Sequence, residues 1–133
     1  VSFFMNMLAL AYVAFGGAIG SMARFLMVTF VSKYSSPDFP YGTLAVNILG
    51  GLLLGLWVGA MAYMSPLKVR DLHLLFAVGA LGGFTTFSAF SLDVILLMER
   101  AGLLQAAFYA VSSVLLSVVA LFIGMLAVKL AAG

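Results

Sequence analysis

The segment that decides the fold reads Gly82-Gly83-Phe84-Thr85-Thr86-Phe87-Ser88-Ala89-Phe90-Ser91. It places two glycines, four hydroxyl side chains and three phenylalanines in the middle of an otherwise ordinary apolar run. Lipid offers no hydrogen bonds to backbone groups, so irregular backbone at membrane depth persists only where it is buried in protein or lines a polar cavity. The segment therefore predicts a broken membrane helix and a candidate ion site.

The composition around this segment is that of an integral membrane protein. The chain has 133 residues, of which 65% are hydrophobic and 8% are charged. Its uncharged runs each meet the roughly 20-residue requirement for a spanning helix. They predict an all-α fold with one domain over residues 1–133 and four membrane helices, at about 3–31, 42–64, 72–98 and 104–130. The first run lacks the basic start and small-residue cleavage site of a signal peptide, so we expect it to be a retained span.

Several functional classes are excluded by what the sequence lacks. The absence of cysteine excludes disulfides and thiolate metal sites. The six lysines and arginines are spread over loops and helix ends, so no basic patch for nucleic acid is present. His73 is the only histidine and makes no metal site alone. No set of nucleophile, base and orienting group can be assembled, so we do not expect an enzyme.

The basic residues are distributed evenly between the two sides of the membrane. Four spans put three of them on the side of the termini and three on the other side, namely Lys68, Arg70 and Lys129 against Arg24, Lys33 and Arg100. The orientation of a membrane protein is set by an excess of lysine and arginine on one side of the membrane. This chain has no such excess, so we hypothesise that it inserts in both orientations. Transporters with broken helices usually build their site from two inverted repeats, and the segment at 82–91 occurs once. An antiparallel homodimer would supply the second half.

A helix break can serve an ion of either sign. Its freed carbonyls suit a cation, and the N–H groups that open the next helix suit an anion. The hydroxyls of Thr85, Thr86 and Ser88 are available to cap backbone groups freed by the two glycines. Phe87 and Phe90 share one helix face, and the positive edges of their rings favour a small anion. The alternative is that both rings only face lipid or fill the core.

Further polar residues lie within the other predicted spans. Asn47 has Thr43 one turn before it in the second span, and its amide either locks a neighbouring helix or donates to a permeating species. Tyr109, Ser113 and Ser117 recur every four residues in the fourth span and therefore share one face. This stripe of donors without a carboxylate suits an anion track better than a proton relay.

Two charges lie close to or inside the spans. Arg24 is about two turns before the predicted end of the first span, so its side chain either snorkels to the interface or concentrates anions at a vestibule. Asp93 either anchors the third span at the interface or pairs with a basic residue.

We expect the glycines at four-residue spacing to serve close helix packing; they are Gly16 and Gly20, then Gly51, Gly55 and Gly59, then Gly79 and Gly83.

Taken in order, these motifs resemble the Fluc (CrcB) family of fluoride channels, small bacterial membrane proteins with four spans. The resemblance covers nearly the whole chain. Its most specific part is the segment at 82–91. It is joined by Gly42-Thr43-Leu44-Ala45-Val46-Asn47, the glycine-rich start up to Arg24, and the stripe of Tyr109, Ser113 and Ser117.

The resemblance implies a dual-topology antiparallel homodimer in the bacterial inner membrane, with passive fluoride export that relieves fluoride toxicity. It implies that Asn47 coordinates fluoride with support from Thr43, that Phe87 and Phe90 contact it by their ring edges, and that the stripe extends the path. The fluoride pathway would comprise Asn47, Phe87, Phe90, Thr43, Thr86, Ser88, Tyr109, Ser113 and Ser117, with Arg24 near a vestibule. A structural sodium ion would be held by the backbone carbonyls of Gly82 and Thr85 from both subunits.

Two other classes of membrane protein are compatible with four spans. A small multidrug transporter exchanges protons for lipophilic cations and needs an intramembrane acid. The first span has none, and Asp93, near a predicted helix end, is the only candidate. A non-transporting assembly subunit would use its glycines for packing alone, which leaves Asn47 and the polar break without a role.

Overall fold

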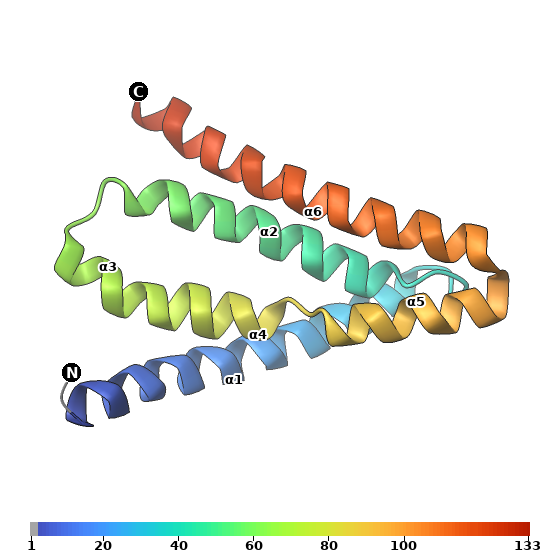
Figure 1. Cartoon of the computed structure of the whole chain (residues 1–133), viewed down its shortest axis with the longest axis horizontal. Helices are drawn as coiled ribbons and strands as arrows, with labels where there is room; N and C mark the ends of the chain where they lie inside the picture. Colours follow the sequence, from blue (N-terminus) through green and yellow to red (C-terminus); the bar gives the residue numbers. More distant parts are fainter. Residues whose placement is uncertain (1–2) are drawn as a thin grey trace.

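The computed structural model describes residues 3–133 and shows four long apolar segments that run alternately in opposite directions (Figure 1). The two ends of the chain lie at the same end of the molecule as the connection between α2 and α3. Four segments are long and apolar enough to cross a membrane. The helical elements are α1 (Phe3–Tyr34), α2 (Tyr41–Met61), α3 (Pro66–Leu72), the π-helix η1 (His73–Leu81), α4 (Gly82–Phe84), α5 (Ser88–Ala101) and α6 (Leu103–Ala132).

The third span begins earlier than the sequence predicted. We placed its start at residue 72 and assigned the charged segment 68–71 to a connection, which is wrong because α3 begins at Pro66. Proline suits the first turn of a helix, since its fixed φ is helical and its missing N–H would have no partner there. Ser65 is extended, and its carbonyl accepts hydrogen bonds from the N–H groups of Lys68 and Val69, each at 3.1 Å. The charged turn is therefore helical.

The turn between α5 and α6 is tighter than predicted. Of the segment 99–102, only Gly102 lies outside the helices. Its φ of +100° is in the region that favours glycine. The Gly102 N–H donates to Met98 at 3.0 Å, and its carbonyl accepts from Ala106 at 3.2 Å. A single residue thus reverses the chain and places α5 against α6.

Glycines bring the helix backbones together, as the sequence predicted. α1 packs on η1 and α4, and α2 packs along α6. A Cβ on Gly51 would lie 2.6 Å from the carbonyl oxygen of Ser117, and a Cβ on Gly83 would lie 2.6 Å from that of Gly17. Neither approach leaves room for a side chain, so both positions require glycine for packing.

The break in the third span lies after the two glycines rather than at them. Gly82 and Gly83 are helical in α4, which corrects our prediction that they interrupt the helix. The chain instead leaves the helix at Thr85, whose φ of −81° and ψ of 159° are extended, and resumes at Ser88. Glycine is needed at position 83 because the backbone there lies close to α1. The backbone departure itself depends on contacts with α2.

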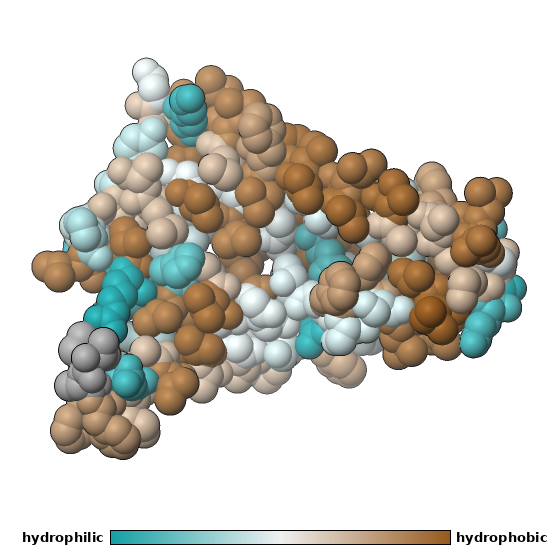
Figure 2. All heavy atoms as spheres, in the orientation of Figure 1, coloured by the Kyte–Doolittle hydropathy of each residue, from teal (hydrophilic) through white to brown (hydrophobic). Residues whose placement is uncertain are grey.

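The surface matches a chain surrounded by lipid. Large apolar side chains are exposed along the helices, and strongly apolar residues cover most of the visible long sides (Figure 2). Near the middle, where the third span is interrupted, residues of intermediate hydropathy take their place. The most buried side chains are Val46, Leu97 and Tyr109. The core therefore lies beside the break, among α2, α5 and α6.

Candidate functional site

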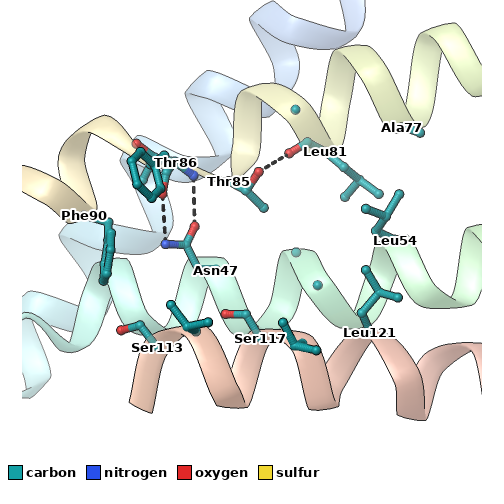
Figure 3. A pocket seen from close by; sticks show the side chains of 16 residues that line it. Asn47, Leu54, Ala77, Leu81, Thr85, Thr86, Phe90, Ser113, Ser117 and Leu121 are labelled. Atoms are coloured by element: carbon teal, nitrogen blue, oxygen red, sulfur yellow. Dashed lines mark hydrogen bonds between the residues drawn. The ribbon is translucent and has the colours of Figure 1, made fainter. Parts of the chain in front are cut away.

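The amide of Asn47 holds the broken backbone from the facing helix. Its Nδ2 donates to the Thr86 carbonyl at 3.0 Å, and its Oδ1 accepts from the Thr86 N–H at 2.9 Å (Figure 3). An amide side chain carries two N–H donors and one carbonyl oxygen. One side chain thus satisfies both backbone groups of Thr86 and retains one N–H for another acceptor. The structure therefore shows the first of the two predicted roles of Asn47, in which its amide holds a neighbouring helix. Donation to a permeating species stays a prediction.

Two threonine hydroxyls satisfy neighbouring groups at the break. Thr85 Oγ1 donates to the Leu81 carbonyl at 2.9 Å, and Thr86 Oγ1 accepts from the Ala89 N–H at 3.1 Å. The second contact is of the kind found at the start of a helix, where a side-chain oxygen accepts from the backbone N–H three residues later. Ser88 is exposed at the start of α5 and does not line the cavity beside the break. The predicted capping role therefore falls on Thr85 and Thr86.

These contacts release two backbone carbonyls from the helix. In a continuous α-helix the Gly82 carbonyl would accept from the Thr86 N–H, and the Thr85 carbonyl from the Ala89 N–H. Both N–H groups donate to side-chain oxygens instead. Carbonyl oxygens are ligands that hard cations accept. The carbonyls of Gly82 and Thr85, to which the resemblance gives the sodium ion, are thus among the carbonyls that lose their helical donors at the break.

A cavity of about 370 Å³ opens beside the break (Figure 3). It lies among α2, η1, the break, α5 and α6, and no acidic or basic side chain lines it. The hydroxyl oxygens of Ser113 and Ser117 are buried and have no hydrogen-bond partner among the described residues. Its other polar and aromatic lining residues include Asn47, Thr85, Thr86, Phe87 and Phe90. The cavity therefore combines a few neutral polar side chains with apolar and aromatic walls.

The two phenylalanines at the break are neighbours with different surroundings. Their ring centroids are 5.8 Å apart with an interplanar angle of 45°. Phe90 is buried and packs 5.4 Å from the Tyr109 ring, whereas Phe87 is 78% exposed. Phe90 therefore fills the core and lines the cavity at once. Phe87 has a large ring that this chain alone does not cover.

The stripe on α6 is divided between two environments. Ser113 and Ser117 line the cavity, while the Tyr109 hydroxyl donates to Asp93 Oδ2 at 3.3 Å. Asp93 lines a second cavity of about 330 Å³ together with Thr43. Thr43 is buried one turn before Asn47 but faces this other cavity. Asp93 is therefore partnered by a tyrosine rather than by a basic residue, a contact that the sequence alone did not predict.

Arg24 lies farther inside its helix than we expected. α1 continues to Tyr34, so ten residues, or about 15 Å of helix, follow Arg24. Gly20, one turn before it, approaches the backbone of Ala80 and Phe84. Arg24 is thus close in depth to the break, but it lines neither the cavity there nor the one at Asp93. Its predicted place near a vestibule stays a prediction.

The fold and this cavity define a multi-pass membrane protein with an uncharged cavity at a broken helix. The family model described as "CrcB-like protein, Camphor Resistance (CrcB)" matches residues 11–125. The "Fluoride-specific ion channel FluC" of Phenylobacterium zucineum (strain HLK1) is 49% identical over 120 residues, which are 90% of this chain and 94% of that relative. The protein of the same name from Agrobacterium fabrum (strain C58 / ATCC 33970) is 45% identical over 119 residues, with 90% and 94% covered.

The chain belongs to the CrcB family, because the matched region and both relatives cover most of its length. The resemblance seen in the sequence is thereby confirmed. The relatives carry the name of an ion channel, and this chain is a member of a channel family rather than an enzyme.

Proposed function

We propose that this protein is a fluoride channel that lets the anion leave the cytoplasm passively and so relieves fluoride toxicity. The observation that carries the proposal is the cavity at the break, which the unpartnered Ser113 and Ser117 line together with Phe90 and which no carboxylate lines. A small anion would accept from the hydroxyls and contact the positive ring edges. The relatives' name supports fluoride as that anion. The membrane would be the bacterial inner membrane.

We propose further that two copies assemble as an antiparallel dimer. Polar groups exposed to lipid without partners are costly, yet this cavity is open on its side and Phe87 is largely uncovered. An inverted copy against this face would close the cavity and cover the ring. The three-to-three distribution of basic residues supports insertion in both orientations. Tags placed at the two termini should be accessible from both sides of the membrane, and a single orientation would contradict the dimer.

A sodium ion at the dimer centre is the third part of the proposal. The carbonyls of Gly82 and Thr85 have lost their usual helical donors, so they are free to hold a hard cation. Two copies would double the number of carbonyl ligands. Replacing sodium with N-methylglucamine during purification should lower the thermal stability of the dimer, and readdition of sodium should restore it. Equal stability in both salts would contradict the site.

The proton-coupled antiporter needs an intramembrane acid that is alternately protonated and bound to substrate. Asp93 remains the candidate, eight residues before the end of α5, and it is bonded to Tyr109 rather than exposed in the cavity at the break. The geometry favours the channel because no acidic side chain lines the cavity at the break.

Flux measurements separate the two functions. Proteoliposomes loaded with fluoride should release it rapidly, followed with a fluoride electrode, while chloride is retained. Phe90→Ile should slow fluoride release without preventing assembly, since it removes the ring edge beside the serines. Phe76→Ile, at an exposed ring outside the cavity, is the matched control. Retention of fluoride together with uptake of a lipophilic cation driven by a proton gradient would overturn the proposal.

A further inference from the structure

A third cavity lies between the first turns of α2 and the first half of α6. Its volume is about 760 Å³, which is larger than that of the cavity at the break. Its walls are mainly apolar and aromatic, with Leu44, Leu104, Phe108 and Leu116 among them. From Leu104 to Leu116 the groove follows α6 for twelve residues, or about 18 Å. That length is close to one leaflet of a hydrocarbon core about 30 Å thick.

The groove opens on a different part of α6 from the cavity at the break. Ser112 and Leu116 line the groove, whereas the residues that follow each of them, Ser113 and Ser117, line the cavity. Consecutive helical residues are rotated by about 100°. No residue lines both spaces. The groove and the cavity at the break are therefore separate spaces on different sides of α6.

One end of the groove is polar and carries a negative charge. Asp38 and Ser36 line it there, on the connection between α1 and α2. The Asp38 carboxylate is exposed, and its one described hydrogen bond is from the Ser36 hydroxyl, at 3.4 Å. Most of its acceptor capacity is therefore available to a ligand.

A positive charge lies at the same loop, in the neighbouring cavity that shares Ser36 and Phe39 with the groove. Arg100 Nη2 donates to the backbone carbonyl of Asp38 at 3.2 Å, which holds the guanidinium at the same loop. A guanidinium has five N–H donors, so others remain for a phosphate. The groove thus offers an anion for an ammonium group, and the cavity next to it offers a cation for phosphate.

We propose that this groove binds one phosphatidylethanolamine molecule. An acyl chain would lie along α6 between Leu104 and Leu116, the phosphate would accept from Arg100, and the primary ammonium would donate to Asp38. The charge order of the headgroup, phosphate followed by ammonium, is complementary to Arg100 of α5 and Asp38 of the loop, which a hydrogen bond holds together. A choline headgroup has no N–H to donate, and a glycerol headgroup has no positive charge. The proposal concerns a separate site and does not depend on fluoride conduction.

Native mass spectrometry of the purified full chain tests this inference. The protein is mixed with equal amounts of phosphatidylethanolamine, phosphatidylcholine and phosphatidylglycerol that share the same acyl chains. We expect about tenfold more retained ethanolamine lipid than choline lipid, since the contact with Asp38 is a charge-assisted hydrogen bond. Asp38→Asn should bring that ratio close to one. Glu99→Gln, which removes an exposed carboxylate near the same loop but outside the groove, should keep the preference.

A second variant tests the groove itself. Ser112→Phe places a large ring in the groove and should reduce retention of all three lipids several-fold, with the helical circular dichroism spectrum unchanged. Equal retention of the ethanolamine and choline lipids by the unmodified protein would overturn the proposal, as would a preference that survives Asp38→Asn. If Ser112→Phe instead dissociates an oligomer and leaves lipid retention unchanged, a second copy occupies the groove and the proposal is wrong.

Discussion

Replacing Asn47 with leucine removes both hydrogen bonds that hold the backbone of Thr86, at 2.9 and 3.0 Å. A buried polar group left without a partner costs about 1–3 kcal/mol, so two such groups would cost roughly 2–6 kcal/mol. The cavity beside Thr86 is open, and water that enters it would satisfy part of this loss. We therefore expect the lower end, about 2 kcal/mol, which is roughly thirtyfold in the unfolding equilibrium.

Asn47→Asp separates the two bonds. A carboxylate still accepts from the Thr86 N–H but cannot donate to the Thr86 carbonyl. Its stability should fall between those of the unmodified protein and Asn47→Leu. The assay is the free energy of unfolding in mixed micelles, with Asn6→Leu as the control, because Asn6 is an exposed amide in α1. If Asn47→Leu is as stable as Asn6→Leu, the amide does not hold the break and the reasoning fails.

Three further predictions concern packing, the serines and the single histidine. Gly83→Ala should destabilise the fold by about 1–3 kcal/mol through overpacking against Gly17. As a control, Gly17→Ala should change the unfolding free energy little, because its Cβ would meet only an oxygen at 3.9 Å. Equal losses of unfolding free energy in the two variants would refute the packing argument. Ser113→Ala breaks no hydrogen bond in this chain, so fluoride efflux from liposomes should fall while thermal stability is retained, and the reverse pattern would show a structural role. Trp57 Nε1 donates to His73 Nδ1 at 3.0 Å, so His73→Phe, which removes the acceptor, should change the emission of this single tryptophan. An emission spectrum identical to that of the unmodified protein would rule out this hydrogen bond.

The sequence alone was sufficient for the class of protein and the general position of the break. Apolar runs of spanning length identify membrane helices because the bilayer has a fixed thickness, and the structure has four segments long and apolar enough to cross a membrane. The four-residue spacing of glycines predicted close packing because side-chain size alone decides how near two backbones approach. The order of the motifs was sufficient for the family.

Contacts between distant segments decided the details of the site. Gly82 and Gly83 have low helix propensity, but the packing of α4 on α1 keeps them helical. The chain leaves the helix only where Asn47, 39 residues earlier, offers Thr86 a side-chain partner in place of the helical one. A backbone N–H or carbonyl pairs with the partner that the folded chain brings near it. For Thr86 that partner is Asn47, which lies outside the local sequence. Local sequence therefore determined which segment was able to break, and the tertiary structure determined the residue at which it breaks and the carbonyls that it frees, those of Gly82 and Thr85 among them.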